Sequence, residues 1–509
     1  MDRIIETYDT TLRYATFEGS DGVKLEERLG IVRTLDDLGI TYIDIGTPDG
    51  SEEYEAFLAA LAEMELENSL LTPFIEARSC GRRMGTDPVV LRILETGAKV
   101  ICVEGECSEH LIREEGRVRL DENLWMISQA ISWFRSRGKT VIFNARNYFD
   151  SLSASASYAR EVLKTAAAAG ADRIILCDTS GFGLFHDITA GIDVARMQYS
   201  RRLGIQCANS SGCADSNAVV AVKSGVTHIQ GSFLGTGPNG NISLAVTIVN
   251  LQVNMGYSCI PYMKLNRLTY SAEYIADQMD VTVPPAMPYV GRLAFAAEHP
   301  VIPNSRSANL SQPEVVGNSR QVNLVTSYAL SVLVERMNKM GYNVTRDLIT
   351  SLDIWKEYHR GYATEVSIAL QILRGLGRVN SVFEIQDVKV LAERIPTVSY
   401  TRSSVVMISR FEGEEITTVG TGSDMLDAFW QAMSNAIRGR IPQAQNLRVS
   451  STRWRALERS EYSSICDVTN GERSWSVSAV QATELECLCS MARDVVDYHL
   501  LGIGYYKKK

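Results

Sequence analysis

Polar and charged side chains stand at the ends of several apolar, strand-like runs in this sequence. Two of them are arginines, Arg13 and Arg146, and a pair of guanidinium groups can hold a carboxylate or an enolate oxygen through parallel hydrogen bonds. Such cations can stabilise negative charge that develops during a reaction. The other strand-end residues are Tyr14, Asp44, Gly46, Glu76, Arg78, Glu104, Asp178, Thr179, Gln206, Asn209 and Gln230.

Each of these residues also has a purely structural interpretation. Arg146 can form an ion pair with Glu104 or Glu76 and simply fill the interior, because buried pairs need not be functional. Thr179 can cap the helix that follows it. Cys207, which invites a nucleophile role, can be a small packed thiol at the end of a strand. The residue types alone leave these alternatives open.

Eight strand-like runs alternate with amphipathic segments, and the positions are 4–12, 41–46, 69–77, 100–105, 140–146, 173–179, 204–209 and 227–232. Glycine often precedes the next run, as in LGITYID and GADRIIL, which is typical of helix C-caps in βα units. Eight such units predict a (β/α)₈ TIM barrel, whose chemistry sits where the strands end. A doubly wound sheet is the alternative, but no GxGxxG turn follows the first run.

We therefore predict the α/β fold class, with a TIM-barrel domain over residues 1–265. Residues 266–378 combine a proline-rich stretch, VTVPPAMPYVG, with helical patterns, and we expect helical linker subdomains there. Residues 379–509 contain a weak internal repeat of two strands and a helix, at 404–437 and 462–500. Two such ββα copies predict a small α+β domain of the kind used for regulation or dimerisation.

Composition narrows the classes of partner. A net charge of −9 argues against nucleic acid and anionic membranes as partners. No apolar run is long enough to cross a bilayer, and the first residues lack a signal-peptide core. The ten cysteines include no CxxC pair, and several lie in apolar runs, which indicates buried thiols in a reducing compartment. We expect a cytoplasmic protein.

Six segments, taken in order, resemble one enzyme family. They are YDTTLR at 8–13, LDDLGITYIDIGTP at 35–48, AGADRIILCDTSG at 169–181, GVTHIQGSFLGTGPNGN at 225–241, MPYVGRLAFA at 287–296 and WKEYHRGY at 355–362. Together they resemble the isopropylmalate/citramalate/homocitrate synthases, and most closely the citramalate-synthase-like branch. The resemblance implies a barrel that holds a divalent metal, a linker, a C-terminal regulatory domain and condensation of an acyl-CoA with a 2-oxo acid.

The sequence departs from the pattern of this family at its chemical centre. The metal-binding aspartate falls on Tyr14, and the two metal histidines fall on Gln206 and Ala208. The catalytic glutamate falls on Arg146, and the adjacent histidine of the citramalate branch falls on Asn147. The histidine-bearing run after the linker motif becomes FAAEHPVI, with His299 displaced. The positions that survive are Arg13, His110, Thr179, Asn209 and Asn241. We therefore expect no metal at this position.

Two functions remain in view. The first is a divergent, metal-independent acyltransferase or lyase, in which Arg13 and Arg146 anchor the anion and His110 or Tyr14 carries the proton. Its predicted substrate-binding residues are Arg78, Glu104, Thr179, Gln206, Asn209 and Asn241. Its substrates would be a small carboxylate or 2-oxo acid and acetyl-CoA or another acyl-CoA.

The second function is that of a non-catalytic, ligand-binding or regulatory subunit, which could pair with an active paralogue. An ordinary metal-dependent synthase would need other ligands, such as Glu76, Glu104 or Asp178, and we rank it last. In each case the relatives imply a homodimer. His359 and Tyr362, in the linker motif, are expected at the surface or at an interface.

Overall fold

The computed structural model describes residues 4–14, 23–77, 84–115, 118–199, 201–295, 312–318, 321–323, 334, 337–338, 343–345, 347–348, 362–395, 400–441, 444–457, 461–471 and 474–507. The chain divides into two compact units, residues 1–283 and 284–509. In the part of the chain that is described, no helix is long and apolar enough to cross a membrane.

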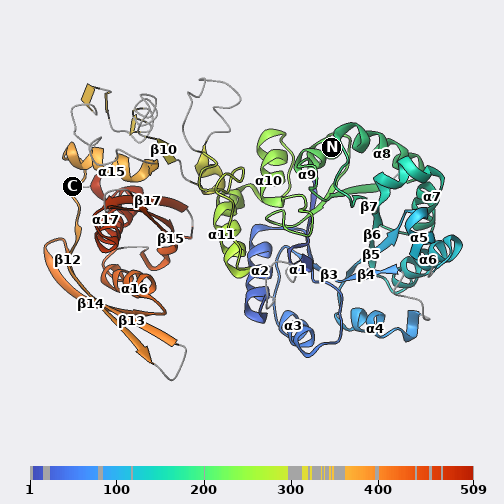
Figure 1. The fold of residues 1–509 in the computed structure, drawn as a ribbon, viewed down its shortest axis with the longest axis horizontal. Coiled ribbons are helices and arrows are strands. Elements are labelled where there is room, and N and C mark those ends of the chain that lie inside the picture. The colour runs from blue at the N-terminus through green and yellow to red at the C-terminus, as the bar shows by residue number, and fades with distance from the viewer. Residues whose placement is uncertain are drawn as a thin grey trace. The chain divides into compact units, whose positions relative to one another are not determined.

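The first unit is built on a nine-stranded parallel sheet in the order β3-β2-β1-β9-β8-β7-β6-β5-β4 (Figure 1). Its strands are β1 (Glu6–Asp9), β2 (Tyr42–Asp44), β3 (Leu70–Thr72), β4 (Phe74–Glu76), β5 (Val100–Glu106), β6 (Thr140–Arg146), β7 (Arg173–Asp178), β8 (Arg202–Cys207) and β9 (His228–Gly231). The two edge strands, β3 and β4, are separated only by Pro73, which has no amide hydrogen for a ladder. They are therefore one interrupted strand, and the sheet closes as the predicted eight-stranded barrel.

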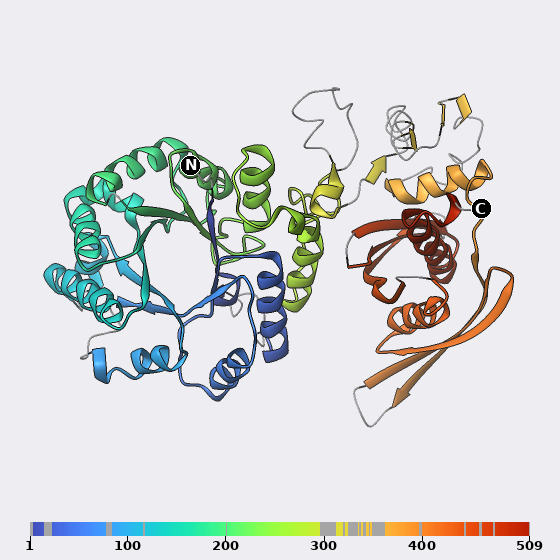
Figure 2. The same ribbon diagram turned by 180° about the vertical axis from the view of Figure 1, so that it is seen from behind.

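Helices follow the strands and cover the outside of the barrel, as the two opposite views in Figures 1 and 2 show. They are α1 (Thr11–Tyr14), α2 (Leu25–Leu38), α3 (Glu52–Ala62), α4 (Pro88–Glu95), α5 (Glu109–Glu115), α6 (Leu120–Arg135), α7 (Tyr148–Ala168), α8 (Phe185–Gln198), α9 (Ala214–Lys223), α10 (Leu244–Val249) and α11 (Leu268–Gln278). Short turns of helix lie at η2 (Met84–Thr86), η3 (Asn250–Asn254) and η4 (Tyr262–Arg267). Gly39 ends α2 with a φ of 89°, as the C-cap pattern predicts.

The barrel interior is filled by alternate residues of the strands. Tyr8, Tyr42, Val100, Cys102, Ile142, Ile175 and Cys177 form one buried cluster, with Phe74 packed against it. Because side chains alternate along a strand, Glu104 and Arg146 share the inward face with Cys102 and Ile142 but lie nearer the C-terminal end. Cys207 lies one residue beyond the inward-facing Gln206 and therefore faces the helical layer.

The second unit contains two antiparallel sheets, each with a helix against it. The first comprises β12 (Phe383–Ile395), β13 (Tyr400–Phe411) and β14 (Glu414–Gly422), followed by α16 (Met425–Ile437). The second comprises β15 (Arg448–Leu457), β16 (Glu461–Thr469) and β17 (Ser474–Gln481), followed by α17 (Glu484–Gly502). Buried residues of both halves form one core. The predicted repeat is therefore present, but each copy has a further strand, β12 or β15, that the repeat pattern did not include.

The expected linker region contributes one helix to each unit, α11 (Leu268–Gln278) to the first and α15 to the second. α11 packs on α2, and the Tyr274 side chain closely approaches Gly30. α15 (Glu365–Gly375) packs on α17, where Arg374 Nη1 lies 2.7 Å from an oxygen of Asp494. The remaining short elements are η5 (Pro313–Val316), β10 (Gln321–Asn323), β11 (Tyr362–Thr364), η7 (Ala444–Asn446) and η8 (Tyr505–Lys507). The three-domain division stays a prediction, while the contacts of α11 and α15 favour the boundary near residue 283.

Candidate active site at the C-terminal end of the barrel

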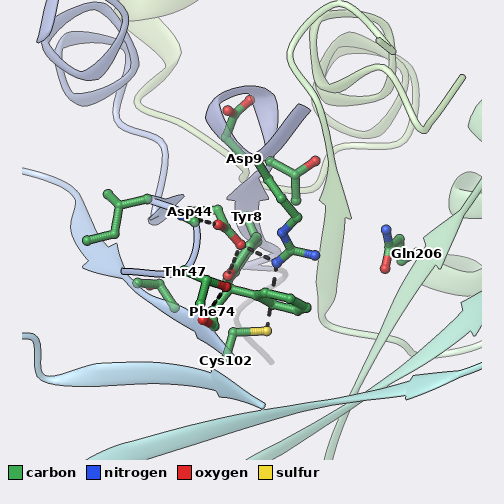
Figure 3. Close-up of polar contacts among 12 residues, drawn as sticks. Tyr8, Asp9, Asp44, Thr47, Phe74, Cys102 and Gln206 are labelled. Atoms are coloured by element: carbon green, nitrogen blue, oxygen red, sulfur yellow. Dashed lines mark hydrogen bonds and ion pairs between the residues drawn. The ribbon is translucent and has the colours of Figure 1, made fainter. Parts of the chain in front are cut away.

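Arg13 lies on α1, immediately after β1, and its guanidinium group donates a hydrogen bond to Asp44 at the end of β2. Asp44 also accepts hydrogen bonds from the Tyr8 hydroxyl at 2.7 Å and from the Gly46 amide at 2.8 Å. The guanidinium carbon stands 3.9 Å from the centroid of the Phe74 ring, a cation–π contact. Figure 3 shows Tyr8, Asp44, Phe74 and Cys102 gathered together, with Gln206 standing apart from them.

This arrangement fixes the orientation of Arg13. Its side chain is only 12% exposed, and the buried Asp44 balances part of its positive charge. The guanidinium group is thus an oriented donor at the end of the barrel interior. Tyr14, one of the two predicted proton carriers, follows directly in the chain, but its side chain lies outside the described part of the structure.

Arg146 ends β6 and faces two carboxylates of the neighbouring strand β5. Its Nη1 lies 3.8 Å from Glu104 Oε1, and its Nε lies 3.9 Å from Glu106 Oε2. Both separations are at the outer limit for an ion pair and too long for hydrogen bonds. The side chain is 38% exposed, so Arg146 offers a solvent-accessible cation whose two carboxylate partners hold it loosely.

Glu106 is held by other partners. Asn147 Nδ2 donates to both of its carboxylate oxygens, at 3.1 and 3.0 Å, and the Ser108 amide donates to one of them at 2.7 Å. Asn147 adopts a left-handed backbone conformation, with a φ of 56°, at the start of α7. The backbone amide of Asn147 donates a hydrogen bond to the Thr179 hydroxyl at 2.9 Å. Thr179 thus fixes the junction between β6 and α7 and does not act as a simple helix cap.

Glu104 has a different environment from Glu106. Its side chain is 15% exposed, and within the described residues it accepts no hydrogen bond. Burial raises the pKa of the Glu104 carboxyl above its ordinary value, and Glu76 and Glu106 add to the rise, whereas Arg13 and Arg146 oppose it. A sheltered carboxyl with a raised pKa beside a cation is a common feature of functional sites.

The ends of β8 and the loops beside it hold the surviving amides. Gln206 Oε1 lies 3.4 Å from the Cys177 thiol. Asn209 Oδ1 accepts from the backbone amide of Ala214, the first residue of α9, at 3.1 Å. Asn241 is buried, and its Oδ1 accepts from the Ile242 amide at 2.9 Å. Asn209 and Asn241 therefore hold loop backbone in this structure.

These residues do not fit a divalent cation. Ala208 carries no ligand atom, and the side-chain oxygens of Gln206, Asn209 and Asn241 accept hydrogen bonds from the protein itself. Among the described residues, no group of three or more His, Cys, Asp or Glu side chains could hold a metal, so Glu76, Glu104 and Asp178 form no alternative set. Asp178 instead accepts hydrogen bonds from the Gly181 and Gly183 amides, both at 3.1 Å.

Other predicted residues lie elsewhere. His110 is exposed on α5, and its Nε2 lies 3.4 Å from Glu114 one turn further along the helix. Cys207 is fully buried, and burial raises the pKa of its thiol well above the ordinary value, so the thiol is not activated. Arg78, His299 and His359 and the side chain of Tyr362 fall outside the described residues.

The sequence did not indicate the contacts that three residues make in this site. Tyr8 orients Asp44, Glu106 faces Arg146, and Asn147 occupies Glu106. The sequence could have indicated Glu106, because it directly follows the expected strand 100–105. In the parallel register of β5 and β6, Glu106 is the partner of Arg146. No pattern in the sequence indicated that Asn147 would take both oxygens of Glu106.

Residues 4–275 match the family model described as HMGL-like. The chain is 29% identical over 513 residues to an (R)-citramalate synthase of Aquifex aeolicus, covering 97% of each chain. It is 28% identical over 523 residues to an (R)-citramalate synthase of Synechocystis, covering 97% of this chain and 95% of that one. A probable 2-isopropylmalate synthase of Methanopyrus kandleri is 25% identical and covers 85% of each chain.

Among solved structures, the HMG-CoA lyase of Bacillus subtilis aligns with a TM-score of 0.47 and 17% identity. The alignment covers 56% of this chain and 97% of that one.

Proposed function

Since the chain belongs to the HMGL-like family, in the citramalate-synthase-like branch of the isopropylmalate/citramalate/homocitrate synthases, we propose that it condenses an acyl thioester with a small 2-oxo acid. We propose that this condensation proceeds without a metal at the usual position. The relatives named citramalate synthase align over nearly the whole chain, which supports this class of reaction. The 2-oxo acid would bind at the C-terminal end of the barrel, where α/β barrels carry out their chemistry.

The observation that carries the proposal is the loose pairing of Arg146. Its guanidinium group is 38% exposed and lies 3.8 Å or more from both neighbouring carboxylates, so a substrate carboxylate can displace those contacts at little cost. An Arg–carboxylate pair in a sheltered site forms two parallel hydrogen bonds. Arg146 is the group we assign to the substrate carboxylate.

Arg13 supplies the second cation. Asp44 and Phe74 fix its guanidinium group, so that little reorganisation is needed when negative charge develops on the 2-oxo oxygen. The positive charges of both arginines lower the pKa of Glu104 on the inward face of β5, although burial outweighs them and raises it. This pair of cations is the electrostatic stabilisation that we propose in place of the metal.

The test is the release of thiol from acetyl-CoA by the purified protein, in EDTA, with a panel of 2-oxo acids. We expect turnover with at least one acid, and we expect Arg146→Gln to raise its KM at least tenfold. Arg113→Gln is the matched control, because Arg113 is an exposed arginine paired with Glu109 on α5. An Arg146→Gln protein with unchanged KM would remove Arg146 from the site.

The alternative function, a non-catalytic ligand-binding subunit, gives a different result in the same experiment. It is favoured by the exposed position of His110, which leaves one of the two predicted proton carriers on the surface of α5. In that case calorimetry would detect binding of a 2-oxo acid, while no thiol would be released in EDTA or after addition of magnesium, manganese or zinc.

A further inference from the structure

We infer that Glu104 is the catalytic acid–base group of this site. The inference rests on the proposed condensation and assigns its proton-transfer step to a carboxylate on β5. The sequence predicts Glu104 as a substrate-binding residue, an ion-pair partner of Arg146 or an alternative metal ligand, and it assigns the proton to His110 or Tyr14. The residue at the family's catalytic position, Arg146, is permanently protonated and cannot act as a base.

The position of Glu104 suits this role. It lies on the inward face of β5, two residues beyond the interior Cys102, at the end of the strand. Its side chain is 15% exposed, so the carboxyl is largely sheltered from water and is still accessible to a small substrate. Arg146, the proposed anchor for the substrate carboxylate, lies 3.8 Å away.

The contrast with Glu106 identifies which carboxylate is available. Both lie on β5 and both face Arg146, but Glu106 accepts hydrogen bonds from Asn147 and Ser108 and is 3% exposed. Glu104 accepts none within the described residues, so its oxygens are available to a substrate proton. One carboxylate is therefore committed to the structure, and the other is free to react.

The charged groups that face Glu104 come from three neighbouring elements and from its own strand. Arg13 on α1 and Arg146 on β6 favour the carboxylate form, whereas Glu76 on β4 and Glu106 on β5 oppose it. Burial outweighs the arginines, and the pKa of Glu104 rises above its ordinary value. A carboxylate with a raised pKa is a stronger base near neutral pH than an exposed one.

The proton balances in the proposed step. The Glu104 carboxylate removes a proton from the carbon next to the thioester carbonyl, and the electron pair of that C–H bond forms the new bond to the carbonyl carbon of the 2-oxo acid. The carbonyl π pair becomes an alkoxide lone pair, stabilised by the arginines. The carboxyl then returns its proton to the alkoxide. Water later cleaves the thioester and releases the free thiol.

The experiment compares Glu104→Gln with the wild type and with Glu161→Gln, a control at an exposed carboxylate on α7. We expect Glu104→Gln to lower kcat at least a hundredfold while its Kd for the 2-oxo acid stays within threefold of the wild-type value. It should also abolish deuterium exchange from solvent into the acyl methyl group. A Glu104→Gln protein that keeps kcat within tenfold of the wild type would overturn the inference.

A second measurement remains decisive if Glu104→Gln does not fold. Removing the cation in Arg146→Gln should raise the pKa of Glu104, so the acidic limb of the kcat profile should move to higher pH. An unmoved limb would refute the assignment. If the wild-type protein releases no thiol, the proposed function and the inference are refuted together. If both the wild type and the Glu104→Gln variant are active, the inference alone is refuted.

Discussion

Asn147 donates its side-chain amide to both carboxylate oxygens of Glu106, at 3.1 and 3.0 Å. The two residues lie on neighbouring segments, at the start of α7 and the end of β5, and Arg146 stands directly before Asn147. Because Asn147 satisfies Glu106, the carboxylate makes no close ion pair with Arg146. The Arg146 guanidinium thus stays 3.8 Å or more from both carboxylates of β5.

The first prediction removes this amide. Asn147→Gly keeps the left-handed backbone, since glycine adopts a φ of 56° without strain. We expect Glu106 to pair closely with Arg146 and to compete with the substrate carboxylate, raising the Kd for the 2-oxo acid about tenfold, or about 1.4 kcal/mol. Isothermal titration calorimetry measures the change. Unchanged affinity in a folded Asn147→Gly protein would show that Asn147 does not control Arg146.

The sequence predicts the framework because strands and helices leave periodic signals. The eight runs, the glycine caps and the polar strand ends identified the barrel and placed Arg13, Glu104 and Arg146 at one end of it. The sequence also predicts an ion pair between Arg146 and Glu104 as a structural interpretation, and the structure has this pair at 3.8 Å.

Side-chain direction and hydrogen-bond partners were not predictable in the same way. A sequence motif fixes the position of His110 in the chain, but the helical phase of α5 turns it to solvent beside Glu114. The commitment of Asn209 and Asn241 to loop backbone depends on loop geometry that no periodicity encodes. The same is true of Asn147, whose left-handed conformation aims its amide at β5.

The second prediction concerns the contact between the loops that follow β7 and β8. Gly181 has a φ of 72°, and a Cβ there would lie 2.7 Å from backbone atoms of Ala208 and Ser210. Gly181→Ala should therefore combine backbone strain with a clash and separate the loops that carry Thr179 and Asn209. We expect a lower thermal unfolding midpoint in calorimetry and a higher KM for the 2-oxo acid.

Gly138→Ala is the matched control for this variant. Gly138 has a similar φ of 74°, but a Cβ there would meet no atom within 4 Å. The control therefore carries the backbone strain, about 1–2 kcal/mol, without the clash. Equal losses in the two variants would mean that the loop contact contributes nothing.

The third prediction uses the buried carboxyl of Asp9, at the end of β1. Burial raises its pKa to about 7, and Asp44 adds to the rise, although the amide and hydroxyl of Thr11 donate to it. The folded protein then binds a proton that the unfolded chain releases near pH 4, so this group costs stability as pH increases from about 4 to 7. Asp9→Asn should be more stable than the wild type at pH 8, by up to a few kcal/mol, and the difference should be smaller at pH 5.

Calorimetry of the barrel transition at pH 5 and pH 8 checks this prediction. Asp193→Asn, at an exposed position on α8, is the control and should show the same difference from wild type at both pH values. A pH-independent loss of stability in Asp9→Asn would mean that the carboxyl is ionised when buried.

The last prediction concerns the opposite end of the barrel, where Glu6 accepts two hydrogen bonds from Arg173 and one from Arg202 at 2.7 Å. Burial opposes ionisation of Glu6, but hydrogen bonds from Arg173 and His228 outweigh it and hold the pKa well below its ordinary value. The stabilisation by ionised Glu6 is thus present above about pH 4.5 and declines as pH falls.

Glu6→Gln should cost about 3–5 kcal/mol of unfolding free energy at pH 7, because it leaves Arg173 buried without its partner, and it should cost less at pH 3. Arg202→Gln, at a side chain that is 61% exposed, should cost less than about 1 kcal/mol. Equal losses in the two variants, measured by calorimetry at pH 7, would show that the buried pair has no special weight.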